Sequence, residues 1–215
     1  MSPTSCDALT IVFAKAPRAG EVKTRLIPLL GAAGAAALHR QLVQRTLATA
    51  TEAGLGPVEL HAAPDINDTF LQDCARHFGV ALAPQHGHDL GARMRNALDD
   101  GLVRHSRVII IGTDCPVLTA QHLRDANAAL TEGNDAVLIP AEDGGYALMG
   151  LTRCDETLFE NIAWGGDCVL SVTRDRLKAL KWHWRELETL WDIDRPEDYR
   201  RWSELLIINE KKYLA

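Results

Sequence analysis

The segment VIIIGTDCPVL, residues 108–118, decides the fold because it joins a short apolar run to a turn that presents a carboxylate. The run at 108–111 predicts a strand, and Gly112 lets the chain turn tightly after it. Asp114 then emerges at the carboxyl end of that strand, and Pro116 ends the extended stretch. In open α/β sheets, ligands bind beyond the carboxyl ends of the strands, so such residues are the first candidates for a functional site.

Similar strand-like runs lie on both sides of this segment and alternate with helical patterns. In the first predicted helix, Leu38, Leu42 and Leu47 mark one apolar face at helical spacing. This alternation indicates βαβ units and a mostly parallel central sheet with helices on both faces. The predicted strands are 9–13, 58–62, 80–83, 108–111 and 136–140, and the predicted helices are about 33–53, 67–78, 90–103 and 119–132.

The regular alternation of predicted strands and helices ends at about Gly144. A strand at 146–151 follows its predecessor too closely for a helical crossover, which favours local antiparallel pairing. A helix at about 167–180, a strand at about 182–187 and a last helix from Pro196 to about 208 follow, with Asp194 or Arg195 at the last helix's cap. No internal repeat or linker stands out, so a single α/β domain over residues 1–215 is predicted.

Composition narrows the class of protein. The formal net charge of −6 argues against general nucleic-acid binding, which usually requires a basic face. The first eight residues show no secretory signal pattern, and apolar runs such as 108–111 are too short to cross a membrane. Five scattered cysteines without a C-x-x-C pair indicate reduced thiols in a cytoplasmic protein, with Cys115 favoured as a buried spacer over a nucleophile.

The loop after the first strand, within FAKAPRAGEVKTRL at 13–26, gathers four cations: Lys15, Arg18, Lys23 and Arg25. It fits neither a Walker A loop nor a dinucleotide-binding fingerprint. One interpretation is a solvated basic turn. The alternative is a polyphosphate cradle, in which side chains and backbone N–H groups neutralise a diphosphate.

Carboxylates after the strands are candidate metal ligands. Asp114 could cap a helix, but beside a diphosphate it would be the hard oxygen ligand that Mg²⁺ or Mn²⁺ prefers. In LWDIDRPEDY, at 190–199, Asp192 and Asp194 precede the last helix. Capping would explain one of them, and a second metal ligand would explain the other.

Glycines and aromatic residues mark a candidate acceptor site. In PAEDGGYALMGL, at 140–151, Asp143 precedes Gly144 and Gly145, which predicts a tight turn between strands. The paired glycines also let a substrate approach the backbone, and Tyr146 adds a polar-tipped ring. Trp164 could be a core residue, but its glycine neighbours favour a mobile loop that receives a sugar or another acceptor.

The segment QHGHDLGARM, at 85–94, follows the third predicted strand. Its two histidines, His86 and His88, are weak evidence for a metal site because no carboxylate cluster accompanies them. Gly87, Asp89 and Gly91 fit better as a loop that folds over a base or ribose.

Taken in order, five of these segments resemble a bacterial family of GT-A-like proteins with the nucleotide-diphospho-sugar transferase fold, often identified as glycosyltransferases and in part linked to arsenosugar biosynthesis. The resemblance covers about residues 8 to 202 and extends more distantly to molybdenum-cofactor and phospholactate nucleotidyltransferases. The five segments are FAKAPRAGEVKTRL, GHDLGARM, IGTDCPVL, PAEDGGYALMGL and WDIDRPEDY.

The resemblance implies a single-domain Rossmann-like GT-A fold that binds a nucleotide through its amino-terminal half. It implies a divalent ion, Mg²⁺ or Mn²⁺, on Asp114 and Asp194, and phosphate contacts from Thr24 and Arg25. The resulting nucleotide-binding set is Ala14, Lys15, Lys23, Thr24, Arg25, Gly87, Asp89 and Gly91.

The expected function is metal-dependent glycosyl transfer from a nucleotide-diphospho-sugar donor to a small-molecule acceptor. Asp114, Asp143 and Arg25 are the expected catalytic residues, with Asp143 orienting or deprotonating an acceptor hydroxyl. Two alternatives stay open: a nucleotidylyltransferase that joins a nucleoside triphosphate to a phosphorylated acceptor, and a nucleotide-binding protein without turnover. No nucleic acid or membrane partner is expected.

Overall fold

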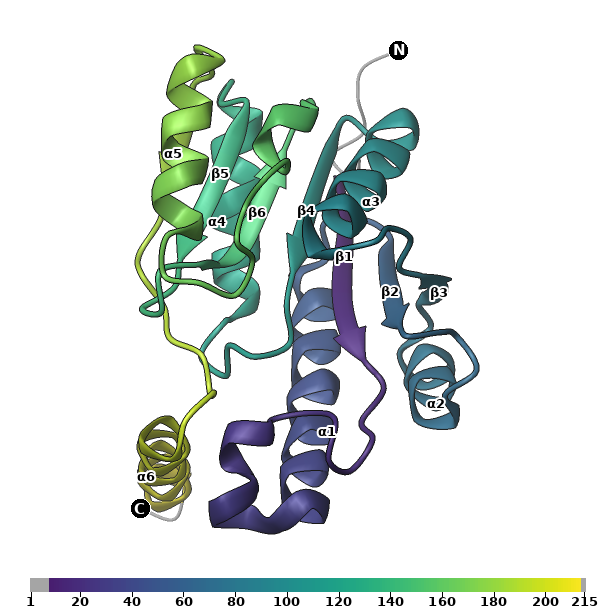
Figure 1. Cartoon of the computed structure of the whole chain (residues 1–215), viewed down its shortest axis with the longest axis vertical. Coiled ribbons are helices and arrows are strands. Elements are labelled where there is room, and N and C mark those ends of the chain that lie inside the picture. Colours follow the sequence, from purple (N-terminus) through teal and green to yellow (C-terminus); the bar gives the residue numbers. More distant parts are fainter. Residues whose placement is uncertain (1–7, 214–215) are drawn as a thin grey trace.

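The computed structural model of the chain describes residues 8–213, and side chains as far as residue 206. A seven-stranded sheet runs through the molecule in the order β3-β2-β1-β4-β6-β5-β7 (Figure 1). Two predictions fall outside this description: the interpretation of residues 1–7 as lacking a signal pattern, and Cys6 as a reduced thiol. The strands are β1 (Ala8–Lys15), β2 (Val58–Ala63), β3 (Ala81–Pro84), β4 (Arg107–Ile111), β5 (Ala136–Pro140), β6 (Tyr146–Leu151) and β7 (Trp184–Glu186).

Helices connect the strands as the alternation predicts. Two short 3₁₀ helices, η1 (Thr24–Leu26) and η2 (Glu156–Leu158), supplement them. The α-helices are α1 (Ile27–Ala53), α2 (Thr69–Phe78), α3 (Leu90–Arg104), α4 (Ala120–Thr131), α5 (Val169–Ala179) and α6 (Pro196–Tyr213).

The sheet is mostly parallel, as predicted. Strand β1 pairs in parallel with β2 and with β4, and β5 pairs in parallel with β7. Strand β6 is the exception, because it runs antiparallel to both β4 and β5. Only the turn 141–145 separates β5 from β6, too short for the helical crossover that a parallel pair needs, which confirms the antiparallel prediction.

Helices cover both faces of the sheet, which confirms the predicted fold class. In β4, Ile109 and Ile111 pack into a core with residues of α1 and α4, whereas Val108 and Ile110 pack into a second core with residues of α3. Figure 1 shows α3 and α5 in front of the sheet and α1 and α4 behind it. Both faces of β4 are therefore buried under helices, which accounts for its continuous apolar run.

Helix α1 begins earlier than predicted and is interrupted. Gly31 has φ 70° and ψ 164°, so a first helical turn is separated from the long helix that the sequence predicts from about residue 33. The stretch Thr24–Ala53 has the length and apolar composition of a membrane span. Here, however, Val43 and Leu47 are fully buried against the sheet, so α1 is a core helix.

A third core cluster fastens the end of the chain to α1. Leu38 and Leu42 of α1 pack with Trp191 and Ile193, and Tyr199 of α6 joins them. Arg195, one of the two predicted caps, directly precedes α6, and the Asp198 carboxylate, inside the first turn, accepts hydrogen bonds from the backbone N–H groups of residues 194 and 195.

Gly150 in β6 offers a test of the packing between sheet and α4. A Cβ at this position would lie 2.6 Å from Val137 Cγ1 and 3.1 Å from Leu130 Cδ1. We expect Gly150→Ala to lower the free energy of unfolding by about 1–3 kcal/mol, as overpacked cores do. Gly112→Ala is the control, because a Cβ there meets nothing within 4 Å. Urea titrations measure both, and equal midpoints would contradict the expectation.

Candidate active site

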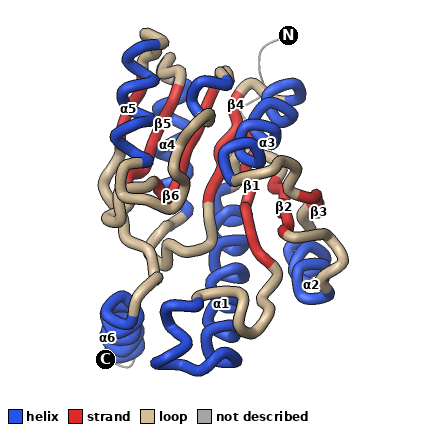
Figure 2. Tube along the Cα trace, in the orientation of Figure 1, coloured by secondary structure: helices blue, strands red, loops and turns tan. Residues whose placement is uncertain are grey.

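Two cavities meet at the carboxyl edge of the sheet, where the loops after β1, β4 and β5 gather (Figure 2), and Asp114 lines both. The first, here called the acidic chamber, has a volume of about 300 Å³ and lies beside β4 and β6. The second, the basic pocket, has a volume of about 310 Å³ and lies under the loop after β1. The basic pocket is lined by Lys15, Glu21, Val22, Lys23, Thr24, Arg25, His39, Asp114 and Asp194.

Lys23 is the buried member of the basic pocket. Its backbone adopts a left-handed conformation with φ 49° just before η1, and only 4 % of its side chain is exposed. The ammonium lies 2.6 Å from Asp114 Oδ1 and donates a hydrogen bond to the carbonyl of Ile193. A buried ammonium requires such partners, so Lys23 is a structural ion rather than a solvated loop cation.

Arg25 is placed differently, although it lies two residues further along the chain. Its guanidinium forms an ion pair with Asp194, and both side chains are substantially exposed. An exposed pair is held by little free energy, so Arg25 can exchange its partner for a ligand. Arg18, the fourth cation of the loop, pairs with Glu21 and Asp65 and is not among the residues that line the basic pocket.

His39 completes the basic pocket, and the sequence analysis missed it. Its Nε2 lies 3.0 Å from the carbonyl oxygen of Lys15, and because a carbonyl only accepts, Nε2 carries the proton. Burial lowers the pKa of His39, although the Asp114 carboxylate opposes the shift. The buried Nδ1 therefore presents a lone pair that no described residue of the chain uses. A histidine on the otherwise apolar face of the first helix is the signal that could have found it.

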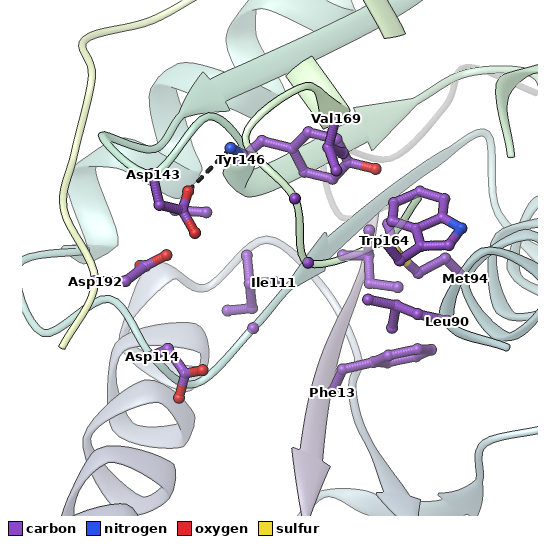
Figure 3. Close-up of a pocket in the computed structure, with 16 residues that line it drawn as sticks. Phe13, Leu90, Met94, Ile111, Asp114, Asp143, Tyr146, Trp164, Val169 and Asp192 are labelled. Atoms are coloured by element: carbon purple, nitrogen blue, oxygen red, sulfur yellow. Dashed lines mark hydrogen bonds between the residues drawn. The ribbon is translucent and has the colours of Figure 1, made fainter. Parts of the chain in front are cut away.

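The acidic chamber holds three carboxylates, those of Asp114, Asp143 and Asp192 (Figure 3). The backbone N–H of Ile193 donates to the carbonyl of Asp114 over 2.9 Å, which lays the segment 192–194 beside the end of β4. Ile193 points into the core, so Asp192 and Asp194 lie on the opposite side, one toward each cavity. Burial, together with the charges of Asp114 and Asp143, raises the pKa of Asp192 to about 7.

The turn that carries Asp143 is both a tight turn and a wall of the chamber. Asp143 Oδ1 accepts a hydrogen bond of 2.9 Å from the N–H of Gly145, and its carboxylate stays exposed. Gly144 has φ 90° and packs against the carbonyl of Asp167, so no other residue fits there without strain. Its own carbonyl accepts from the N–H of Leu170 over 2.8 Å, which fixes the turn to the start of α5.

An apolar wall faces the carboxylates across the chamber (Figure 3). Leu90 is 42 % exposed and lines the chamber. The Tyr146 hydroxyl and Trp164 Nε1 are buried and have no hydrogen-bond partner among the described residues. The wall consists of Phe13, Leu90, Met94, Tyr146 and Trp164.

Glycine 91 makes room for the indole of Trp164. A Cβ at position 91 would collide with Trp164 Nε1 and would lie 2.7 Å from the carbonyl oxygen of Phe159. In this structure Gly91 therefore accommodates a side chain of the same protein. Its predicted contact with a nucleotide stays a prediction.

The rest of the segment 85–94 lies apart from the basic pocket. Asp89 Oδ1 accepts from the N–H of Ala92 over 2.8 Å and caps α3. Gly87 and Asp89 line a separate cavity of about 490 Å³ between α3 and residues 159–162. Ala14 is 2 % exposed within β1. The structure thus gathers Lys15, Lys23, Thr24 and Arg25 but does not bring Gly87 and Asp89 into their cavity.

Two further sequence predictions concern metal sites and cysteines. Among residues 8–213, no group of three or more His, Cys, Asp or Glu side chains is arranged to hold a metal ion. The carboxylates that line the two cavities, whose oxygens suit a divalent ion, are those of Glu21, Asp114, Asp143, Asp192 and Asp194. Burial raises the pKa of Cys115 to about 12, which supports its role as a spacer, and the thiols of Cys74, Cys154 and Cys168 are free as well.

Comparison with known proteins adds a family and a set of solved structures. The family described as an uncharacterized protein conserved in bacteria (DUF2064) matches residues 46–166. A candidate nucleotide-diphospho-sugar transferase from Desulfovibrio desulfuricans G20 is 28 % identical, with a TM-score of 0.80 over 88 % of this chain and 83 % of its own. None of the curated proteins compared with the sequence matches it.

Two more distant structures share the fold. CMP:2-keto-3-deoxy-manno-octonic acid synthetase in complex with CTP is 10 % identical, with a TM-score of 0.62 over 94 % of this chain and 99 % of its own. Glucosyl-3-phosphoglycerate synthase from Mycobacterium tuberculosis, in complex with Mn²⁺, UDP and glucosyl-3-phosphoglycerate, is 11 % identical, with a TM-score of 0.54 over 89 % and 74 %. The resemblance to nucleotide-diphospho-sugar transferases is confirmed, and the neighbours are glycosyl and nucleotidyl transferases.

The contrast between Lys23 and Arg25 can be measured as stability. We expect Lys23→Met to lower the free energy of unfolding by about 1–3 kcal/mol, because the Ile193 carbonyl and the Asp114 carboxylate lose their shared donor. Arg25→Ala should cost less than about 1 kcal/mol, because its pair with Asp194 is exposed. Urea midpoints of the two variants give the comparison. A larger loss for Arg25→Ala would show that the exposed pair holds the loop.

Proposed function

This chain belongs to the DUF2064 family, and we propose that it is a metal-dependent glycosyltransferase that uses a nucleotide-diphospho-sugar donor. The observation that carries the proposal is the position of Asp114 between a basic pocket and an acidic chamber. A donor of this class has an anionic diphosphate and an uncharged sugar. The diphosphate would match the cations of the basic pocket, and the hydroxyl groups of the sugar would donate hydrogen bonds to the carboxylates of the acidic chamber.

The basic pocket would take the diphosphate. Lys15 and Arg25 offer exposed cations, and Thr24 lies beside them at the start of η1. Arg25 would leave Asp194 for a phosphate, since a charge-assisted contact to phosphate is stronger than an exposed ion pair. Lys23 would contribute through the positive charge of its buried ammonium, which lies next to Asp114.

A divalent ion, Mg²⁺ or Mn²⁺, fits the donor set that faces this pocket. Asp114 has one oxygen on Lys23, but 54 % of its side chain is exposed, so the other oxygen can take a hard cation. Asp194, and Asp192 on the chamber side, would supply the second carboxylate. Because protein ligands are few, phosphate oxygens and water would complete the shell. When bound, the ion would neutralise charge that develops on the leaving diphosphate.

The transfer itself would take place in the acidic chamber. The oxygen of an acceptor hydroxyl would bond to the anomeric carbon as the bond from that carbon to the diphosphate breaks, and the nucleoside diphosphate would leave with the bonding electrons. Asp143, exposed at the chamber and bonded only to the Gly145 N–H among the described residues, would accept the hydroxyl proton. Its role is that of a general base and an orienting group.

Nucleotidylyl transfer is the second candidate, because the fold is shared with a CTP-binding synthetase. The two reactions leave different products: nucleoside diphosphate for glycosyl transfer and pyrophosphate for nucleotidylyl transfer. A protein that only binds nucleotides would leave neither. The free cysteines among the described residues agree with a cytoplasmic location, which is part of the proposal.

The deciding experiment is a thermal-shift screen of nucleotides and nucleotide sugars with and without Mn²⁺, followed by product analysis of the best donor. A ligand that binds the folded state raises its melting temperature. We expect a nucleotide sugar to give the largest shift with Mn²⁺ and to release nucleoside diphosphate. A nucleoside triphosphate that gives the largest shift and releases pyrophosphate would overturn the proposal.

Arg25→Ala tests the diphosphate contact. We expect the affinity for the best nucleoside diphosphate to fall roughly ten- to hundredfold, since a charged hydrogen bond is worth about 1.5–3 kcal/mol. Arg18→Ala is the matched control from the same loop, because Arg18 itself does not line the pocket and pairs with Glu21 and Asp65. Calorimetric titration of both variants, beside their urea midpoints, measures the effect. Unchanged affinity in Arg25→Ala would mean that Arg25 is only half of a surface ion pair.

Asp114→Asn tests the metal ligand. The amide keeps the shape of the side chain but is a poorer ligand for a hard cation, so the gain in nucleotide affinity that Mn²⁺ provides should fall at least about tenfold. In metal-free buffer the affinity should stay the same or rise, because a negative charge next to the phosphates is removed. A Mn²⁺-dependent gain equal to that of the wild type would contradict the assignment.

A further inference from the structure

The charges of the two cavities are segregated on either side of Asp114. Sixteen residues line the acidic chamber; three of them are aspartates and none is lysine, arginine or histidine. All the basic side chains at this end of the sheet that line either cavity belong to the basic pocket: Lys15, Lys23, Arg25 and His39. The sixteen residues therefore offer an entering molecule three carboxyl groups and no basic side chain, and Asp192 is partly protonated near neutral pH because its pKa is about 7.

The cation beside the chamber offsets part of the negative charge on Asp114 but offers no free donor to a molecule in the chamber. Lys23 touches Asp114, but its ammonium is buried and engaged by Asp114 and by the Ile193 carbonyl. It is therefore not available to a molecule in the chamber. A divalent ion shared with the donor's diphosphate would not make the chamber positive either, because the diphosphate carries at least as much negative charge as the ion carries positive.

The wall opposite the carboxylates is apolar (Figure 3). Phe13, Leu90 and Met94 provide a surface without hydrogen-bonding groups, and Leu90 is exposed there. The Tyr146 hydroxyl and Trp164 Nε1 are unpaired within the described chain. The apolar side of the chamber thus suits the C–H surface of a ligand. The side with the aspartates suits hydroxyl or ammonium groups of the ligand, which can donate hydrogen bonds.

We propose that the acceptor is a hydroxylated molecule without any anionic group, either neutral or amine-bearing, with one apolar face. The inference rests on the proposed function, since it concerns the acceptor of that reaction. Carboxylates accept hydrogen bonds from hydroxyl and ammonium groups, whereas an anion in the chamber would lose its hydration and meet repulsion. Specificity would arise from rejection of anions as much as from contacts with the acceptor.

This acceptor class bears on the choice between the two reactions. Nucleotidylyl transfer to a phosphorylated acceptor would bring a second phosphate into the chamber, where no basic side chain could receive it. Transfer of a sugar to a hydroxyl brings no charge. The segregation of charge therefore favours glycosyl transfer.

Three probes that share one apolar body test the proposal: benzylamine, benzyl alcohol and benzyl phosphate. The readout is the indole N–H resonance of Trp164 in metal-free buffer, assigned with Trp164→Phe. We expect benzylamine to bind at least about tenfold more tightly than benzyl phosphate, with benzyl alcohol between them. Benzyl phosphate binding as tightly as benzylamine would overturn the proposal, and so would the failure of all three probes to shift the resonance.

Charge variants at Asp143 sharpen the test. Asp143→Asn should narrow the preference for the amine, and Asp143→Lys should reverse it, because the side chain is exposed at the chamber. Asp73→Asn is the control: this exposed aspartate of α2 pairs with Arg76 outside the chamber and should leave the order unchanged. Urea midpoints show whether each variant stays folded. An order unaffected by Asp143→Lys in a folded protein would overturn the proposal.

The probes contain no nucleotide, so their result is independent of donor binding. If the proposed glycosyl transfer fails, no nucleotide sugar will release nucleoside diphosphate with Mn²⁺, while the order of the three probes can still hold. If the acceptor class is wrong, the probe order fails while nucleotide binding stays. The two failures are therefore distinguishable.

Discussion

The ammonium of Lys23 is the contact on which the arrangement of both cavities depends. It joins three segments that are far apart in the sequence: the loop after β1, the end of β4 at Asp114, and the carbonyl of Ile193. The buried charge needs both partners, so the three segments hold one another in place. Asp114 stands at the boundary between the pocket and the chamber because Lys23 holds it on one side and the 192–194 segment on the other.

Much of the fold could be predicted from local sequence patterns. The apolar run of β4 indicated a strand buried on both faces of a parallel sheet, and the short turn after β5 indicated the antiparallel β6. The pattern failed where backbone conformation matters more than hydrophobicity. The helical turn before Gly31 was missed, since its positive φ leaves no mark except a glycine in a glycine- and alanine-rich stretch.

The candidate site was predictable in its residue types and less so in its pairings. The chain order indicated that cations and aspartates would meet at the carboxyl edge of the sheet. It did not indicate that Lys23 would be buried while Arg25 stays exposed. The Ile193 carbonyl that accepts from Lys23 and the Asp194 carboxylate that pairs with Arg25 lie about 170 residues away, in a segment outside the strands of the sheet. The sequence predicted a cap and a second metal ligand for Asp192 and Asp194, but not that Asp192 would line the acidic chamber and Asp194 the basic pocket.

The contact between Gly91 and Trp164 has a consequence for how this family can diverge. The indole occupies the volume that a side chain at position 91 would need, and the carbonyl of Phe159 closes the remaining space. A change at either position is therefore constrained by the other. Relatives with a larger residue at position 91 should have replaced the tryptophan by a smaller side chain, and with it the shape of the wall that faces the three aspartates. Correlated substitution at these two positions would then mark branches of the family whose chambers differ in shape.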